Sequence, residues 1–433
     1  MKKKILLLSI IVAGMANAAS VDYLMNNSTS YFQNPAQTAQ ISVEGVFYNP
    51  AGTAFVDDGL YLNVNAQNSI INESMKVEGK TFDATSFAAV PSFNLLYKKN
   101  DYSLFANASV IGGGATLEYE GGAAGVYLAA AALNSKDPFK GTAMGLNANL
   151  SGGKFIGENR YYQGIIGGAY KVNDKLSVSL GGKYVYATRK LEGTADYTYN
   201  ALSPMGKYLK GNTLSIDSTR KADGVGFTIG ADYKLDETTN FAIKYDSRVR
   251  LTFEAEGTEA DKMLFMGKTL GISAFYPTYA NGVKKERDLP GVLSLGASKS
   301  IGKATYSIGY NHYYNKAADI DGIEYQDGFE ANIGIDYKLN EKITLHGGFN
   351  FADTGAKPST YNDTEYAVNS QIYTTGLTYK PNENNEWKFS LAYVSYNSEN
   401  GENTPSVIGT LEKSKVKYDK AIGVFGIGYT HKF

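Results

Sequence analysis

The dominant pattern in this chain is an alternation of apolar and polar side chains with a period of two. Between Gly224 and Leu235, apolar residues occupy one face of an extended chain, and small or polar residues occupy the other. The segment from Phe329 to Leu339 repeats the pattern. Because successive side chains of a β-strand point to opposite faces, both segments are predicted to be strands with one apolar and one polar face.

The same alternation recurs along most of the chain after Gly59, and it predicts about fourteen strands. Besides the two above, they are 60–67, 93–98, 102–110, 162–171, 176–186, 241–250, 293–299, 304–310, 343–351, 373–380, 387–393 and 421–433. Short polar turns such as 98–101 alternate with long connections such as 112–160 and 255–285. A transmembrane β-barrel sorts its connections in this way. A soluble sandwich or propeller, the alternative fold, gives no reason for such sorting.

The predicted fold is therefore all-β, a closed antiparallel transmembrane barrel in a bacterial outer membrane. Closure leaves no backbone N–H or C=O unpaired in the hydrocarbon, so the apolar faces point to lipid and the polar faces to the lumen. Tyrosines beside the short turns are predicted to form an interfacial belt; they are Tyr97, Tyr170, Tyr233, Tyr337 and Tyr379. The last strand ends in Phe433. This ending resembles the signal that hands such proteins to the barrel-assembly machinery, a predicted partner during biogenesis.

The first residues have the features of a secretory signal peptide. A basic start at 2–4 precedes a short apolar run at 5–15, and Ala16-Asn17-Ala18 fits a small-residue cleavage site. The apolar run is shorter than the roughly 20 residues that a spanning helix needs. The chain is therefore divided into a signal peptide at 1–18, an N-terminal segment at 19–58 and the barrel at 59–433.

Two Asn-Pro-Ala triplets distinguish the segment that precedes the barrel. Residues 34–36 form the first triplet, and Asn49-Pro50-Ala51 forms the second; an aromatic pair precedes each. Asn is a favourable helix N-cap, and Pro suits the first helical position. Each triplet is predicted to begin a short helical turn that is packed by its own aromatics. The alternative is that residues 19–58 form a disordered periplasmic tail.

Composition narrows the possible functions. The chain has 433 residues, a net charge of -1 and no cysteine. A nucleic-acid-binding surface would leave a basic stripe, so no nucleic-acid partner is predicted. Without cysteine, disulfides and thiolate metal sites are excluded. We predict no cofactor and no metal.

At this point the chain resembles the FadL family, the outer-membrane transporters of long-chain fatty acids and other hydrophobic compounds. The resemblance rests on residues 46–52, Val-Phe-Tyr-Asn-Pro-Ala-Gly, which are similar to the family's hatch motif, and on the strand blocks 224–253, 289–298 and 332–349. It implies a monomeric barrel in which residues 19–58 fold as a hatch inside the lumen. It also implies that hydrophobic small molecules bind an external groove, then a lumen pocket, and leave through the wall into outer-membrane lipid.

Apolar side chains in two long external connections are the candidates for the first binding site. Residues 126–133 form one run, and Leu264, Phe265, Met266 and Phe275 belong to the other. Apolar runs on external loops are unexpected unless they pack together or bind something, and Met adapts to varied apolar shapes. The alternative is that these runs only cap the barrel.

Four cations on the polar strand faces are the candidates for a ligand's head group: Lys183, Arg189, Lys244 and Arg248. A carboxylate gains from a charged donor in a desolvated pocket. The alternative is ordinary salt bridging within the lumen.

The glycine run Gly112, Gly113 and Gly114 ends the third strand. Glycine in a strand marks a kink or bulge, so this run is the candidate for the lateral opening. A turn into the long connection explains it equally well.

No catalytic arrangement is indicated, so the chain is not predicted to be an enzyme. The histidines are His312, His346 and His431, and no arrangement of a histidine with a serine on the outer wall, as a barrel phospholipase would need, is indicated. Two other functions remain open. One is a general porin for small hydrophilic solutes, and the other is a surface adhesin or receptor on the same barrel.

Overall fold

A computed structural model describes residues 19–206, 213–260, 263–265, 268–362, 365–403 and 414–433. The strands are β1 (Gly59–Val77), β2 (Lys80–Lys99), β3 (Tyr102–Glu120), β4 (Asn149–Lys171), β5 (Leu176–Thr198), β6 (Thr213–Lys234), β7 (Thr239–Asp246), β8 (Thr252–Ala260), β9 (Met263–Phe265), β10 (Lys268–Leu270), β11 (Lys284–Glu286), β12 (Val292–Ile301), β13 (Ala304–Tyr313), β14 (Gly328–Lys338), β15 (Ile343–Asp353), β16 (Ser370–Asn382), β17 (Asn385–Tyr396), β18 (Glu399–Asn403) and β19 (Ser414–Lys432). The helices are α1 (Gly45–Tyr48), α2 (Ala124–Ser135) and the 3-10 turns η1 (Pro50–Phe55), η3 (Ile272–Ala274), η4 (Pro277–Tyr279), η5 (Asn315–Ala317) and η6 (Pro358–Thr360).

The strands form one antiparallel barrel that closes between its first and last members. β1 pairs with β19 from Tyr61–Lys432 to Lys76–Lys417. Within the described residues the sheet has 17 strands. Three barrel positions are each built from two consecutive pieces, namely β7 with β8, β11 with β12 and β17 with β18, so the wall has 14 positions. The predicted strand number is confirmed.

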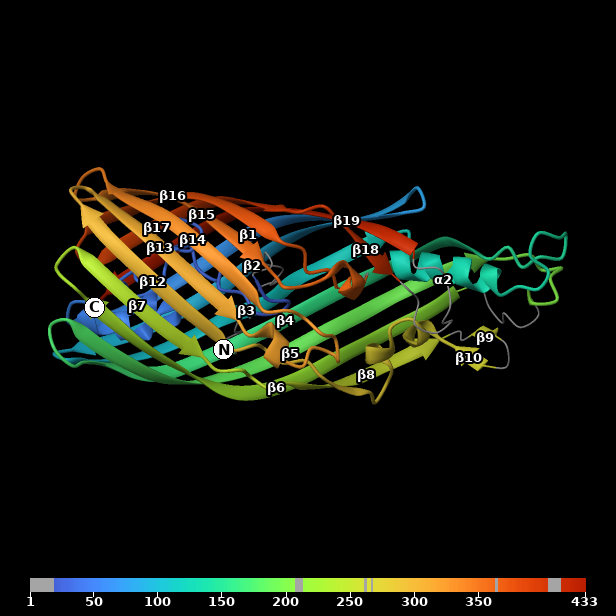
Figure 1. Ribbon diagram of the computed structural model, residues 1–433, viewed down its shortest axis with the longest axis horizontal. Coiled ribbons are helices and arrows are strands. Elements are labelled where there is room, and N and C mark those ends of the chain that lie inside the picture. The colour runs from blue at the N-terminus through green and yellow to red at the C-terminus, as the bar shows by residue number, and fades with distance from the viewer. Residues whose placement is uncertain (1–18, 207–212, 261–262, 266–267, 363–364, 404–413) are drawn as a thin grey trace, which may run out of the picture.

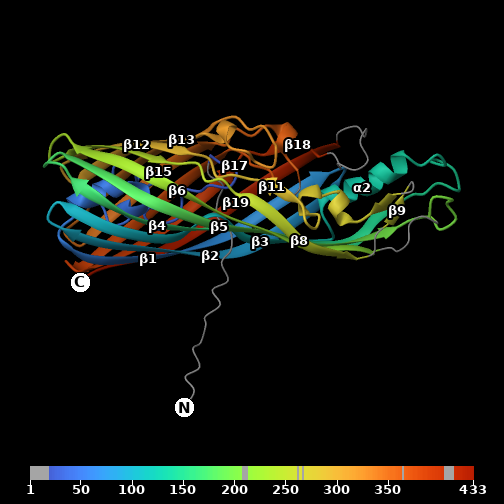
Figure 2. The ribbon, with the colours of Figure 1, turned by 90° about the horizontal axis from the view of Figure 1, so that it is seen from below.

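The barrel is much taller on one side than on the other (Figure 1). β4 and β5 have 23 residues each, whereas β12 and β13 have 10 each. A tilted strand needs only about 9–11 residues to cross a bilayer. The tall side therefore extends well beyond the membrane, and it carries α2 near its tip, at the end away from the C-terminus (Figure 2).

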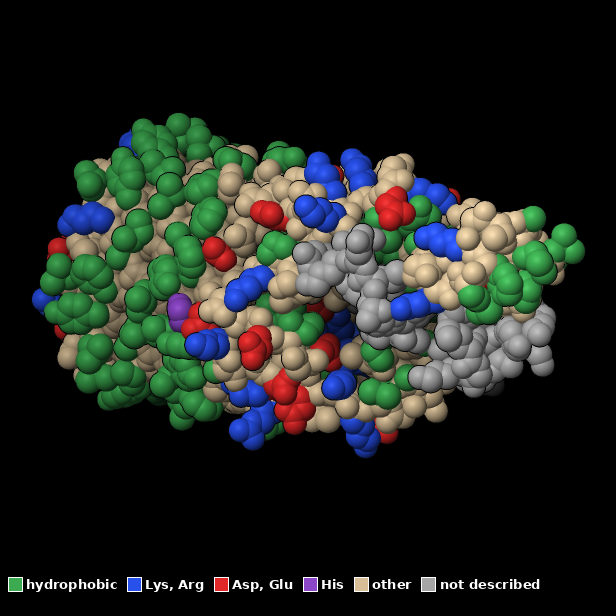
Figure 3. Space-filling model, turned by 45° about the vertical axis from the view of Figure 1, so that its right-hand side comes forward, with side chains coloured by type: hydrophobic (Ala, Val, Ile, Leu, Met, Phe, Trp, Pro, Cys, Tyr) green, Lys and Arg blue, Asp and Glu red, His purple; other side chains and the backbone are tan. Residues whose placement is uncertain are grey.

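The outer wall has the predicted inside-out character. On β5, Val178, Leu180 and Tyr184 are exposed, while Ser177 and Lys183 on the other face are buried. On the face that Figure 3 shows, apolar side chains cover the half of the barrel away from the extension, and charged side chains gather toward the extension. The five predicted belt tyrosines are all exposed, from 40% for Tyr379 to 55% for Tyr170. Among the described residues, no helix is long and apolar enough to cross a membrane.

Sequence reasoning placed several strand ends wrongly. The predicted strand at 241–250 ends at Asp246, and β8 resumes the same barrel position at Thr252. The long connection predicted at 112–160 is shorter, because β3 continues to Glu120 and β4 begins at Asn149. These extensions lie beyond the membrane, where polar residues face water on the outer side and the apolar alternation fades.

The N-terminal segment, residues 19–58, lies within the barrel rather than hanging outside it; most of its side chains are buried, whereas Asp57 and Asp58 at its end are exposed. Its two aromatic pairs pack against each other, since the Tyr31 and Tyr48 rings are stacked with centroids 6.4 Å apart. The second triplet begins a helical turn as predicted, with Pro50 at the first position of η1. The first does not: no helix follows Asn34, whose side-chain oxygen accepts the Ala36 N–H at 3.0 Å in a local turn. Neither asparagine makes the predicted helix-capping bond, and the Asn49 side-chain amide instead donates to Asp232 of the wall.

Candidate functional site

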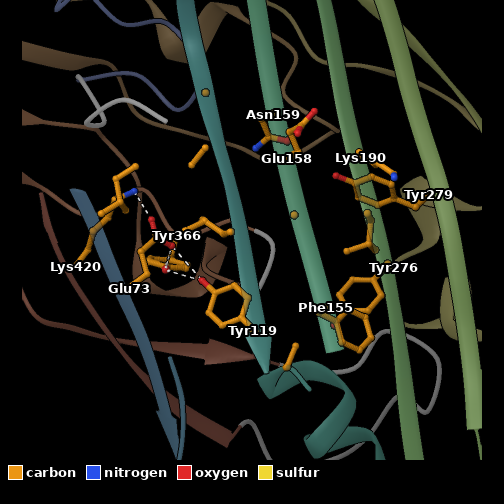
Figure 4. Close-up of a pocket in the computed structure, with 17 residues that line it drawn as sticks. Glu73, Tyr119, Phe155, Glu158, Asn159, Lys190, Tyr276, Tyr279, Tyr366 and Lys420 are labelled. Carbon is orange, nitrogen blue, oxygen red and sulfur yellow. Dashed lines mark hydrogen bonds and ion pairs between the residues drawn. The ribbon is translucent and has the colours of Figure 1, made fainter. Parts of the chain in front are cut away.

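A cavity of about 140 Å³ lies in the upper lumen beneath the external segments (Figure 4). Strands β1, β3, β4, β5 and β19 supply most of its wall, and the connections around η4 and after η6 close it. Its apolar side chains include Ile71, Leu117, Phe155, Leu191 and Tyr276. The Phe155 and Tyr276 rings pack against each other with centroids 6.0 Å apart. Apolar walls with a few polar groups are typical of a small-molecule site.

The polar end of this cavity is organised around Glu73. Lys420 is its cross-strand neighbour in the β1–β19 ladder, and the Lys420 Nζ lies 2.6 Å from the Glu73 carboxylate. The hydroxyls of Tyr119, at 3.1 Å, and of Tyr366 also donate to Glu73. Burial and the charge of Glu73 raise the pKa of Tyr366 well above its usual value, so this hydroxyl stays protonated. The negative charge of Glu73 and the positive charge of Lys420 therefore balance each other in a cluster next to the apolar wall of the cavity.

A second compartment, of about 110 Å³, adjoins the first and shares Glu73, Tyr366 and Lys420 with it. It is bounded by Asp22 of the N-terminal segment, by Arg189 on β5 and by Glu365. The Arg189 guanidinium lies 2.9 Å from Asp22 and 3.4 Å from Glu365. The second compartment, which adjoins the apolar cavity, is therefore bounded by an arginine that already contacts two carboxylates.

A balanced ionic network surrounds this inner compartment. Arg287 is buried and contacts three carboxylates, those of Asp22 at 2.6 Å, Asp321 at 2.7 Å and Glu365 at 2.5 Å. Arg220 on β6 also binds Asp321, at 2.6 Å. With Arg189, three guanidiniums meet three carboxylates that belong to the N-terminal segment and to two external connections. The network therefore couples the N-terminal segment to the external loops.

The barrel wall is interrupted between β2 and β3, close to this compartment. The β2–β3 ladder ends at the Ser92–Ser109 pair, although β2 continues to pair with β1 as far as Lys80. On β2, the residue next to this break is Pro91, which has no N–H to donate. On β3, the six steps from Val110 to Thr116 face only four steps on β4, so two extra residues bulge out.

The N-terminal segment lies against this interruption. The Leu24 N–H donates to the Ile111 carbonyl at 2.7 Å. A Cβ at Gly112 would overlap the Asp22 carbonyl oxygen, so only glycine permits this approach. Gly113 adopts a φ of 61°, and Gly114 a φ of 103°. The glycine run is thus a bulge inside β3 and not a turn into a loop.

Comparison with known proteins bears on what such a barrel does. Residues 164–433, more than half of the chain, match the profile of the family described as "Outer membrane protein transport protein (OMPP1/FadL/TodX)". The chain belongs to this family. It is an integral β-barrel of the bacterial outer membrane, and its family consists of transport channels for hydrophobic compounds.

Two relatives illustrate the range of the family. Outer membrane protein P1 of Haemophilus influenzae is 24% identical over 420 residues, covering 86% of this chain and 81% of the relative. The long-chain fatty acid transport protein of Escherichia coli O157:H7 is 24% identical over 225 residues, covering 44% of this chain and 50% of the relative.

Solved structures support the same fold. A Pseudomonas aeruginosa FadL homologue superposes with a TM-score of 0.68 at 14% identity, covering 95% of this chain and 100% of that chain. The Pseudomonas putida toluene transporter TodX gives 0.60 at 15% identity, covering 90% and 94%.

The four predicted head-group cations lie in ion pairs in this family member. Lys183, at 3.2 Å, and Lys244, at 2.8 Å, share Asp246, deep in the lumen. Lys244 also donates to the Phe47 carbonyl of the N-terminal segment, at 2.9 Å. Arg248 binds Asp288. Of the four, Arg189 borders the second of the two cavities described above, and the other three line neither of them.

The predicted loop residues are less closely grouped. Leu264 and Phe265 lie on β9 in a small hairpin with β10, and Met266 falls outside the described residues. Phe275 is half-buried and packs against the core, whereas its neighbour Tyr276 lines the cavity. The run 126–133 is helical and lies within α2.

Sequence reasoning missed the residues that form the polar end of the cavity. Glu73 and Lys420 lie far apart in the sequence and become neighbours only when β1 closes onto β19. Their position on the polar parity of the first and last strands was the available signal. Tyr366 lies in an external connection with no periodic pattern, so nothing in the sequence indicated its role.

Proposed function

We propose that the protein takes up hydrophobic small molecules by passive diffusion, with long-chain fatty acids as the main class. The cavity that runs from the apolar wall at Phe155 and Leu191 to the charged groups at Lys420 and Arg189 carries this proposal. An apolar tail with an anionic head matches both ends of such a site. A hydrocarbon without a head group would use only the apolar part.

The route would begin at the external loops and continue into this cavity. A carboxylate that enters beside Lys420 competes with Glu73 for the ammonium, and one that reaches Arg189 competes with Asp22 and Glu365. Lys183, Lys244 and Arg248 remain candidates for later contacts along the lumen. Leu264, Phe265, Met266 and Phe275 remain candidates for the first, external contact.

The exit would lie in the wall at Gly112, Gly113 and Gly114, where β2 and β3 are unpaired. An apolar molecule that leaves there enters lipid directly and avoids the aqueous periplasm. The N-terminal segment, residues 19–58, would act as the hatch that blocks the straight path down the lumen. The protein would work as a monomer, since each step uses one barrel.

The proposal also rests on what a rival function would require. A general porin needs an open aqueous lumen, whereas here the Asn49 and Asn34 turns lie in the lumen and bind two parts of the wall, on β6 and β14. An adhesin or receptor would use the external loops without needing the cavity or the break in the wall.

Uptake by cells that lack their own fatty acid transporter tests the proposal. Labelled oleate should accumulate with the wild-type protein, and proteoliposomes should show little swelling in sugars. Replacing Lys420 by Met should slow oleate uptake several-fold and leave toluene uptake nearly unchanged. Lys417→Met is the matched control, because Lys417 lies on the same strand with its side chain 48% exposed. Rapid sugar flux without oleate uptake would defeat the proposal.

A further inference from the structure

The first described residue of the chain is held against the barrel wall. Ala19 is fully buried, and its backbone nitrogen lies 3.4 Å from the Glu330 Oε1 on β14. The Ala19 carbonyl accepts a hydrogen bond from the Asn315 side chain at 3.0 Å. A Cβ at Gly328 would overlap this carbonyl, so glycine is needed there. Glu330 and Gly328 on β14 and Asn315 in η5 thus all lie close to Ala19.

The carboxylate of Glu330 is buried and bound by neutral donors. Its exposed fraction is 1%. The Asn311 side-chain amide donates to Oε2 at 2.7 Å, and the Ala19 nitrogen faces Oε1. Within the part of the chain that the structure describes, no lysine, arginine or histidine forms an ion pair with Glu330. A buried carboxylate without a cation is costly, and the site therefore lacks one positive charge.

We propose that Glu330, Asn311, Asn315 and Gly328 form a binding site for Ala19 as the N-terminal residue, with the Glu330 carboxylate facing its α-ammonium group. That group arises when the peptide bond between Ala18 and Ala19, at the predicted signal cleavage site, is hydrolysed. The reaction consumes one water, leaves a carboxylate on Ala18 and frees an amine on Ala19, which takes up a proton at neutral pH. The missing positive charge then stands at the position of the present amide nitrogen.

This contact fixes more than one residue. From Ala19 at β14, the segment crosses the lumen within a few residues and reaches β3, where Leu24 bonds to Ile111 and Asp22 passes Gly112. Val21 and Asp22 also bound the inner compartment of the cavity. Both ends of this crossing segment are therefore tied to the wall. In the processed chain, the ammonium group of Ala19 supplies the positive charge opposite Glu330. In an unprocessed chain, the same position holds an uncharged amide nitrogen.

Amine labelling of the purified, folded protein tests the inference. Mass spectrometry should place the mature N-terminus at Ala19. An amine reagent at neutral pH should modify Ala19 at least about tenfold more slowly in the folded protein than after denaturation, because modification requires local opening. The exposed Lys417 provides the internal reference. A different N-terminus, or equal rates before and after denaturation, would overturn the inference.

A substitution at the wall separates a charge contact from simple burial. In Glu330→Gln, which keeps the shape and loses the charge, Ala19 labelling should approach the denatured rate. Glu118→Gln is the matched control, since Glu118 lies on the extended part of β3 and binds Lys154 at 2.6 Å, away from Ala19. Unchanged protection of Ala19 in Glu330→Gln would contradict the role of the carboxylate.

If Glu330→Gln does not fold, a one-residue insertion provides a second test of the inference. One glycine between Ala18 and Ala19 moves the new amine by about 3.5 Å while Glu330 stays intact. Folding is checked by heat-dependent migration in detergent gels. The displaced amine should label rapidly. If it is as protected as the wild-type amine, the site does not recognise the position of the ammonium and the inference fails.

Discussion

The side-chain amide of Asn49, in the N-terminal segment, donates a hydrogen bond to the Asp232 carboxylate on β6, at 3.0 Å. The same contact occurs a second time, because Asn34 donates to Asp336 at 3.1 Å. The two receiving strands carry nearly the same sequence, Ile-Gly-Ala-Asp-Tyr-Lys-Leu at 229–235 and Ile-Gly-Ile-Asp-Tyr-Lys-Leu at 333–339. Each Asn-Pro-Ala triplet thus binds one copy of a repeated strand motif.

The repetition extends to the neighbouring strands. Ser179 on β5 pairs with Gly230, and Ser307 on β13 pairs with Gly334. In both copies the asparagine rests over the glycine, which has no side chain to obstruct it. The N-terminal segment is therefore fixed at two equivalent positions of the barrel, four barrel positions apart.

Asn49→Ala should loosen the second contact and leave the barrel intact. Removal of the amide leaves Asp232 buried without this donor, which should cost about 1–3 kcal/mol of stability. Hydrogen exchange over residues 45–55 should quicken, while exchange in the strands should not. Asn68→Ala is the control, because Asn68 bonds at the exposed outer surface. Equal exchange over 45–55 in both variants would contradict the role of this contact.

Gly334→Ala should displace the first contact by steric overlap. The added Cβ would collide with the Asn34 side-chain amide. Gly164→Ala on β4 is the matched control, since nothing lies within 4 Å of its Cβ position. Protease cleavage within residues 30–40 should rise in Gly334→Ala and stay at the wild-type level in Gly164→Ala. Identical cleavage in the two variants would show that the close packing at Gly334 is not required.

Gly112→Ala should separate the N-terminal segment from the break in the wall. Its Cβ would overlap the backbone of Asp22, which cannot rotate away as a side chain can. We expect a cysteine introduced at Val21 to react faster with a thiol reagent in this background, and we expect oleate uptake to change. Gly182→Ala on β5, which has open space at its Cβ position and lines neither cavity, should leave both measurements unchanged.

Acid should weaken the ionic network at the external end. Although burial opposes ionisation, the guanidiniums of Arg287 and Arg220 hold the pKa of Asp321 below its usual value. A group whose pKa is lowered on folding contributes stability above its unfolded pKa, about 3.9, and loses that contribution as the pH falls through the folded pKa. Pepsin cleavage at 315–327 should therefore be slow near pH 4 and rise as the pH is lowered further. Asp321→Asn should already be cleaved readily near pH 4.

The part of the barrel that lies within the membrane was predictable because its sequence pattern depends only on which side chains face lipid. Alternation in segments such as 224–235 indicates which face of a strand meets lipid, and the tyrosines indicate where the lipid ends. The extension beyond the membrane was not predictable, since 149–160 and 213–222 face water on the outside and lose the simple pattern.

The candidate site was harder to derive, since it depends on closure. The Glu73–Lys420 pair exists only because the first and last strands meet, and the network around Arg287 joins segments from four parts of the chain. The two Asn-Pro-Ala triplets and their two matching strands were visible in the sequence. Only the fold reveals that each triplet binds one of those strands.

Photo-crosslinking tests the central proposal most directly. A fatty acid with a diazirine near the tail end is irradiated with the outer-membrane protein, and the modified peptides are mapped by mass spectrometry. The account predicts crosslinks at the apolar part of the cavity, in peptides that contain Phe155, Leu191 or Tyr276, and predicts that excess oleate suppresses them. Crosslinks confined to lipid-facing residues such as Ile166 and Leu180, unaffected by oleate, would contradict it.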